Sequence, residues 1–404
     1  MPDQTTIEKN IAAGFRKLFN SVPKMGGAVG AVEGLTDTRA ELSTDALVEK
    51  AAKSEEQINR IIEEFLGNDT KLKLIAKKIA VEGKDALKAV AADDNSYLEK
   101  NPYKATYLEV IVRTDGTRPS FLIQNGKVNF QSSPESDWAG VFATGGDCLT
   151  HAIECVGRIN DAGGYQVGTG FLIHQDLIIT NRHVLQEIAT LENVGGWKMK
   201  PNYKIDFGFE FRAQKSLNAR GLESVLFVPP DYIDPYDIDH FKLDLVVIKL
   251  SPAPIEMTPI QLLSFGLATE WATPGEIIFT IGYPGNPGLY GLQTYGTLLD
   301  QLFKSTFGYK RIAPGEIIVS EGEVKDWTVT HDATTLGGNS GSLIVTVNNA
   351  CIAAGLHYGG KTNTPRENWG HILGGTLDGP NIVSGNSLRS ILQQNNVKLV
   401  DFTQ

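Results

Sequence analysis

Leu336-Gly-Gly-Asn-Ser-Gly-Ser342 is the most informative stretch of the chain, and it stands between a polar segment and the apolar run 343–345. Glycines on both sides of a serine allow nearby backbone N–H groups to turn toward one point, which is what an oxyanion hole requires. Ser340 is therefore the candidate nucleophile. Because a serine hydroxyl is a weak nucleophile at neutral pH, this hypothesis requires a base and an orienting carboxylate elsewhere in the chain.

Two earlier segments supply a candidate base and a candidate carboxylate. Leu177-Ile-Ile-Thr-Asn-Arg-His183 predicts a strand and a Thr-Asn turn that lead directly into His183. None of the other six histidines follows such a strand and turn. Asp244 opens the apolar strand predicted over 245–249, with Asp237 and Asp239 as nearby alternatives for the same role. A charge at the mouth of an apolar strand needs a partner, since burying it alone is costly, and protonated His183 would be one.

The pattern of the sequence changes along the chain. Short β-rich runs broken by glycine and proline extend from about Val156 to Val383, which is typical of an all-β sandwich or barrel. Residues 5–98 instead place apolar side chains three and four positions apart, as amphipathic helices do. The clearest of these helices begins at Ser43 or Thr44 and ends at Gly67-Asn68.

Three further elements are predicted around these two regions. Tyr107-Leu-Glu-Val-Ile-Val112 and residues 120–124 indicate strands, and Asn125-Gly126 indicates a tight hairpin turn after the second of them. Residues 387–394 predict a last helix.

Length and charge limit what the chain can do. At 404 residues it exceeds one ordinary hydrophobic core, so two or three domains are expected. Its 37 basic and 47 acidic side chains give a formal charge of −10, which argues against broad nucleic-acid binding. No stretch approaches the ~20 consecutive apolar residues of a membrane span.

Asp237, Asp239 and His240 lie close in sequence, but acid-rich loops are usually solvated and no second ligand set is present. We therefore expect no metal and no cofactor.

The cysteines and the amino terminus bear on the cellular compartment. Cys148, Cys155 and Cys351 are too few for a disulfide framework and include no C-x-x-C pair. Cys351 lies in the buried-strand pattern 350–355 and is expected to be a small core residue. The first ten residues do not begin a secretory signal, because no basic segment leads into an apolar one. A cytoplasmic protein that does not enter a membrane is the expectation.

The three segments around His183, Asp244 and Ser340 resemble the trypsin-like, chymotrypsin-fold serine peptidases, and their order along the chain is the same. The resemblance covers about Val156 to Leu392 and includes Gly275-Glu-Ile-Ile-Phe-Thr-Ile-Gly-Tyr-Pro-Gly285. It implies that Ser340 attacks the carbonyl, that His183 is the base and acid, and that Asp244 orients the imidazole. It also implies an oxyanion hole at Gly338, Asn339 and Ser340, built by the N–H groups of Gly338 and Ser340.

The pocket of the resembled family can be compared residue by residue. Digestive members carry an aspartate just before the nucleophile, which pairs with a new amino terminus after cleavage, whereas Asn339 stands here. Thr334 stands where members specific for Lys or Arg carry an aspartate, so a basic P1 residue is not favoured. Thr335 and His357 are similar to glutamyl endopeptidases, which leaves an acidic P1 open, and Tyr358 and Gly359 complete the candidate substrate-binding residues.

The whole chain is expected to be multi-domain and mainly β. A double six-stranded antiparallel β-barrel peptidase of residues 151–395 (barrels at about 151–255 and 256–395) would follow an α-helical region, 1–100, and a small β-containing linking segment, 101–150. The motifs resemble bacterial intracellular trypsin-like proteins with amino-terminal accessory modules, some of them linked to defence or signalling. The expected partners are a protein or peptide substrate and a regulatory protein that contacts residues 1–150. The alternative is a catalytically silent peptidase scaffold that binds other proteins.

Overall fold

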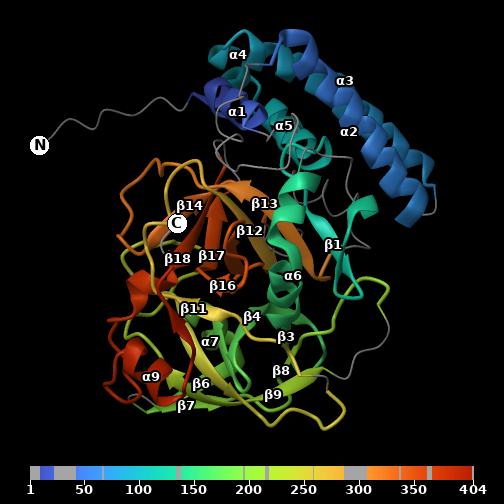
Figure 1. Ribbon diagram of the computed structural model, residues 1–404. Helices are drawn as coiled ribbons and strands as arrows, with labels where there is room; N and C mark the ends of the chain where they lie inside the picture. Colours follow the sequence, from blue (N-terminus) through green and yellow to red (C-terminus); the bar gives the residue numbers. More distant parts are fainter. Residues whose placement is uncertain are drawn as a thin grey trace, which may run out of the picture.

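The computed structural model describes residues 10–21, 42–65, 68–132, 138–193, 196–213, 218–257, 259–285, 307–335, 338–361 and 366–402. Within them, the chain forms a helical module, a closed barrel and a second large sheet (Figure 1). No helix in these ranges is both long and apolar enough to cross a membrane.

The helical module has the amphipathic pattern that the sequence predicts. α2 packs against α3, and both contact α5 at the end of the molecule farthest from the first barrel (Figure 1). Asp69 caps α3 by accepting hydrogen bonds from the N–H groups of Lys71 and Leu72, at 2.7 and 3.3 Å. A Cβ at Gly83 would lie 2.4 Å from Cδ1 of Ile111, so this glycine allows α3 and α5 to approach closely. The helices are α1 (Ile11–Asn20), α2 (Thr44–Phe65), α3 (Thr70–Ala91), α4 (Asn95–Lys100) and α5 (Pro102–Thr114).

The strand predicted over Tyr107–Val112 is wrong, because these residues belong to α5. Pro102 occupies the first turn of that helix, where its missing N–H costs nothing. Residues 108–112 are all buried, including Glu109, so this part of the helix has no solvated polar face to reveal its period. A β-branched apolar run of this kind does not distinguish a buried helix from a strand.

Residues 156–250 form the first barrel. Its six strands are antiparallel and close in the order β10-β5-β4-β3-β8-β9. The strands are β3 (Val156–Asn160), β4 (Gln166–His174), β5 (Leu177–Thr180), β8 (Lys204–Asp206), β9 (Ala219–Phe227) and β10 (Val246–Leu250), with the short helix α7 (Arg182–Ile188) after β5 and the hairpin β6 (Ala189–Asn193) and β7 (Gly196–Met199) beside it.

The second sheet has eight strands in the order β14-β18-β17-β15-β12-β13-β1-β2. It therefore differs from the predicted six, because the hairpin β1–β2 adds to its edge through β1 and β13. Its turn at Asn125-Gly126, with positive φ at both residues, confirms the predicted hairpin. The strands are β1 (Phe121–Gln124), β2 (Lys127–Asn129), β12 (Ile277–Gly282), β13 (Arg311–Glu316), β14 (Thr328–His331), β15 (Leu343–Thr346), β17 (Gly355–Lys361) and β18 (Glu367–Ile372).

Smaller elements join these parts. α6 (Ala139–Cys155) runs beside the second sheet and leads directly into β3 (Figure 1). Its Phe142 ring lies 4.7 Å from that of Phe279 on β12. The predicted last helix is confirmed as α9 (Leu388–Gln394), capped by Ser387. A three-stranded parallel sheet joins β16 (Ile352–Ala353), β11 (Ser264–Gly266) and β19 (Leu399–Val400), and the 3-10 turns are η2 (Phe130–Ser132) and η5 (Leu373–Thr376).

A disulfide joins Cys148 of α6 to Cys351, just before β16, while Cys155 is a buried free thiol. Cys351 is half-buried and disulfide-bonded, so the expectation that it is a small core residue is wrong. The two cysteines are 203 positions apart in sequence, and only the packing of α6 beside the second sheet brings their Cα atoms to 4.6 Å. Such bonds are typical of oxidising compartments, so this one speaks against the expected cytoplasmic location.

We predict that Cys148→Ser lowers the free energy of unfolding by about 3 kcal/mol, because the cross-link restricts the unfolded chain. Urea unfolding with and without dithiothreitol measures this effect. Wild type and the control Cys155→Ser should both lose stability on reduction, whereas Cys148→Ser should not respond. Equal responses in all three proteins would contradict the prediction.

Candidate active site

Two neighbouring strands of the first barrel bring His183 and Asp244 together. β5 ends at Thr180 and pairs with Val246 at the start of β10, so the residues after one strand lie beside those before the other. The Asn181 amide fixes this junction by donating a 2.7 Å hydrogen bond to the Asp244 carbonyl. One Asp244 oxygen then lies 2.6 Å from Nδ1 of His183, and the other accepts a 2.9 Å hydrogen bond from the His183 backbone N–H.

The Asp244 carboxylate is buried but well satisfied. Burial alone would raise its pKa, but the nearby charge of His183 and the two hydrogen bonds from that residue outweigh it and hold the pKa below its ordinary value. The backbone N–H of Asp244 donates to Nε2 of His371 at 2.9 Å. The alternatives Asp237 and Asp239 are exposed, and neither contacts His183 in the described part of the chain.

Backbone geometry holds Ser340 between the two sheets. Gly338 and Gly341 have φ of 92° and 90°, a region that L side chains avoid. A Cβ at Gly341 would lie 1.8 Å from the carbonyl oxygen of Thr169, so only glycine fits there. The Ser340 carbonyl accepts a 2.8 Å hydrogen bond from the Thr169 N–H on β4, and Gly341 N–H donates to the His357 carbonyl at 3.0 Å. Leu336 and Gly337 of the original motif lie outside the described residues.

The segments that carry Ser340 and His183 approach each other at Gly168. A Cβ at Gly168 would lie 2.8 Å from the side chain of Val184, next to His183, and 3.5 Å from the Ser340 carbonyl oxygen. Within the described ranges, no hydrogen bond of up to 3.5 Å joins the Ser340 hydroxyl to the imidazole. Free enzymes often show such long contacts, which shorten when substrate binds.

The candidate oxyanion hole has unused donors. Neither the Gly338 N–H nor the Ser340 N–H donates a hydrogen bond to any described residue. The Gly338 carbonyl accepts from Thr169 Oγ1 at 3.1 Å and from Gln166 Nε2 at 3.2 Å. Asn339 is buried, and its carbonyl oxygen accepts from the Ser342 N–H at 2.8 Å.

Thr334 and Thr335, both predicted to bind substrate, use their hydroxyl protons within the protein. Thr334 donates to the Arg118 carbonyl at 2.6 Å, and Thr335 donates to the side-chain oxygen of Asn368. Neither hydroxyl can donate to a substrate unless it gives up that bond.

His357 and Tyr358 stand among other buried histidines. His357 is 3% exposed, its Nδ1 has no partner among the described residues, and its ring lies 5.5 Å from that of His331. Burial, together with His331 and His183, lowers the pKa of His357 well below its ordinary value. The Tyr358 hydroxyl lies 2.8 Å from Nδ1 of His240, and its ring stacks on His371 at 4.4 Å.

Gly359, the last predicted pocket residue, is closely approached by another loop. A Cβ there would lie 2.9 Å from Cδ1 of Ile238, so a larger residue would push the 229–242 loop away.

His371, Arg118 and Arg366 were not found by sequence reasoning. His371 contacts the backbone of Asp244, and the two arginines contact Thr334. These three residues stand out only because their basic or imidazole side chains are buried. A single sequence does not reveal that burial.

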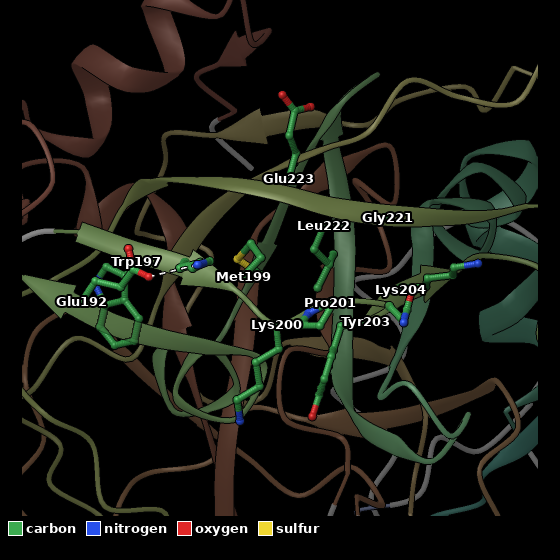
Figure 2. A pocket seen from close by; sticks show the side chains of 12 residues that line it. Glu192, Trp197, Met199, Lys200, Pro201, Tyr203, Lys204, Gly221, Leu222 and Glu223 are labelled. Carbon is green, nitrogen blue, oxygen red and sulfur yellow. Dashed lines mark ion pairs between the residues drawn. The ribbon is translucent and has the colours of Figure 1, made fainter.

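A separate hollow of about 640 Å³ lies on the first barrel, between the β6–β7 hairpin and β8–β9 (Figure 2). Trp197, Met199, Tyr203 and Leu222 contribute to its lining, and a 3.2 Å ion pair between Lys198 and Glu192 crosses its edge. It contains none of the predicted site residues. In the described ranges, no group of three or more His, Cys, Asp or Glu side chains is arranged to hold a metal ion.

Comparison with known proteins agrees with this geometry. Residues 168–353 match the family model of the trypsin-like peptidase domain. This segment is a trypsin-like peptidase domain. A probable serine protease of Lysobacter enzymogenes is 27% identical over 359 residues, which span 81% of this chain and 89% of that protein. The peptidase domain thus contains His183, Asp244 and Ser340, and the similarity to the Lysobacter protein extends beyond it.

Two solved structures of serine proteases are also similar, at lower identity. Mouse neuropsin is 14% identical with a TM-score of 0.39, and the match covers 55% of this chain and 91% of neuropsin. The inactive form of the Rv3671c protease is 18% identical with a TM-score of 0.34, over 62% of this chain and 94% of that protease.

The fully buried His331 generates a prediction about pH. Burial lowers its pKa to about 3, and neither ring nitrogen has a partner among the described residues. Below about pH 6.5 this histidine binds a proton in the unfolded chain but stays neutral in the folded protein. The free energy of unfolding therefore falls as the pH falls from about 6.5 toward 3. His331→Phe should remove ~2 kcal/mol of the stability loss between pH 7 and pH 5.

Urea unfolding at the two pH values measures that difference. The control Trp271→Phe, at a fully buried side chain that does not titrate, should keep the wild-type pH dependence. An unchanged slope in His331→Phe would show that His331 does not titrate as described.

Proposed function

We propose that this serine endopeptidase works through an acyl-enzyme formed on Ser340, with His183 as general base and acid and Asp244 as the orienting carboxylate. The observation that carries the proposal is the double contact of Asp244 with His183, at 2.6 Å to Nδ1 and 2.9 Å to the backbone N–H. This contact places the imidazole proton on Nδ1 and leaves Nε2 free to accept the serine proton.

The steps follow from this arrangement. Ser340 Oγ attacks the peptide carbonyl carbon while His183 Nε2 takes the hydroxyl proton, and ionised Asp244 stabilises the imidazolium that results. The N–H groups of Gly338 and Ser340, which have no partner among the described residues, would receive the negative oxygen of the tetrahedral intermediate. His183 then returns the proton to the leaving amine, and water releases the acyl group by the same steps.

The proposed P1 residue is not basic. The neutral side chain of Thr334 offers no charge for Lys or Arg, and Asp332, two positions earlier, is already paired with Arg118 at 2.7 Å. An acidic P1 is the favoured class because His357 retains a ring nitrogen without a partner in the described part of the chain. Thr335 gives weaker support to an acidic P1 residue than His357 does, since its hydroxyl proton is already donated to Asn368.

The amino-terminal region is proposed to regulate the peptidase and to bind a protein partner. Its support is the contact of α5 and the following loop with residues 332–335. A role in bacterial defence or signalling belongs to the same proposal and is favoured by the resemblance of the motifs alone. The cytoplasmic location stays a prediction, and the disulfide counts against it.

Labelling with a fluorophosphonate probe tests the nucleophile. Full-length wild type should form an adduct that peptide mapping places on Ser340, and Ser340→Ala should form none. Ser342→Ala, the other serine of the loop, should still be labelled on Ser340. If wild type is not labelled while it is folded, the alternative of a silent scaffold replaces this proposal.

Asp244→Asn tests the orienting carboxylate. A neutral amide neither selects the same imidazole tautomer nor stabilises the imidazolium, so kcat should fall roughly 10⁴-fold with little change in KM. Steady-state kinetics on a peptide with an acidic P1 residue measure it. A loss of less than tenfold would exclude Asp244 from this role.

A further inference from the structure

A buried ionic cluster joins the helical module to the segment that leads to the nucleophile. Arg118 donates two hydrogen bonds of 2.7 Å to Asp332, from Nε to one carboxylate oxygen and from Nη2 to the other. The Arg118 side chain is fully buried, and that of Asp332 is 6% exposed. A paired fork of this kind fixes both position and orientation, which a single contact does not.

The same segment is held at further points. The Arg118 carbonyl accepts the Thr334 hydroxyl at 2.6 Å, and Arg366 Nη1 donates to that hydroxyl at 3.1 Å. Arg366 is held in turn by Glu109 of α5, at 2.5 Å. Arg113 of the same helix donates to the Thr335 carbonyl at 3.5 Å. Residues 332, 334 and 335 are thus all contacted by the helical module or by an arginine that the module holds.

The charges of this cluster balance within the protein. Three arginines face three acids, and each of the six side chains is at most 7% exposed. Removing the Arg118 side chain takes away the guanidinium that both Asp332 oxygens face, and a buried carboxylate that loses its cation tends to move or to admit water. The six residues are Arg113, Arg118, Arg366, Glu109, Glu316 and Asp332.

We infer that Arg118 is a positioning residue of the peptidase, which holds the pocket wall 332–335 in its substrate-binding form from outside the peptidase domain. This inference rests on the proposed function, because it assigns Thr334 and Thr335 to the pocket. The helical module is then part of the working enzyme, and a substrate gains its P1 contacts only while Arg118 pairs with Asp332.

Two reactions of the full-length protein separate positioning from general stability. Diisopropyl fluorophosphate reacts with an active serine without filling a P1 pocket, whereas a peptide substrate requires that pocket. Arg118→Ala should lower kcat/KM for the peptide on the order of 10²-fold, the cost of a small misplacement, while the labelling rate of Ser340 stays within about threefold. Arg118→Lys, which keeps the charge but loses the fork, should give an intermediate loss.

Arg220 offers a matched control. It is a buried arginine of β9 that donates to the Ser251 carbonyl at 2.9 Å, in the first barrel. Arg220→Ala and Arg220→Lys should change labelling and peptide cleavage in parallel, whatever stability they lose. Thermal unfolding establishes which variants are folded, and if Arg118→Ala is not, the two lysine variants carry the comparison.

The rates of Ser340 labelling and of peptide cleavage distinguish the role of Arg118 from that of Ser340. A drop in peptide cleavage without a drop in labelling, confined to the Arg118 variants, supports the inference. Parallel losses in the folded Arg118 variants, or no loss in either reaction, would overturn it while leaving Ser340 in its role. If folded wild type is not labelled at all, the proposed function fails, and this inference fails with it.

Discussion

The contact between His183 and the buried Asp244 carboxylate is the constraint on which the rest of the site depends. A carboxylate in that position is costly unless its oxygens are satisfied, and both are, by two N–H groups of the same residue. The first barrel supplies this pair from two adjacent strand ends, and the segment before β15 in the second sheet supplies Ser340. The two halves meet where Gly341 packs against the backbone of Thr169 on β4, which leaves no room for a side chain at position 341.

The helical module contacts the second sheet. The chain passes from α5 through the buried Arg118 to β1, which pairs with β13, so the first strands of the second sheet precede the peptidase domain in sequence. The Cys148–Cys351 disulfide then ties α6 to the residue before β16 of the three-stranded parallel sheet. Ion pairs and hydrogen bonds therefore join α5 and the loop after it to the second sheet, while strand pairing ties β1 to the same sheet.

The sequence predicts best what depends on neighbours in the chain. The amphipathic period of α2 and α3, the Asn125-Gly126 turn and the strand that leads to His183 are local features, and each is confirmed. The prediction fails where burial decides, as at residues 108–112 of α5, which are all buried. Likewise, the cysteine pairing and the bonds of Thr334 and Thr335 exist only because the fold joins distant segments. The residues next to these positions in the sequence give no indication of such contacts.

The most direct test of this account is the proton between His183 Nδ1 and Asp244, observed by proton NMR of the full-length protein. A proton held between an imidazole nitrogen and an ionised carboxylate at 2.6 Å should resonate far downfield of the amide region. We expect that signal in wild type and in Ser340→Ala, and we expect it to disappear in Asp244→Asn. Its absence from folded wild type, or its persistence in Asp244→Asn, would contradict the central claim that Asp244 orients His183.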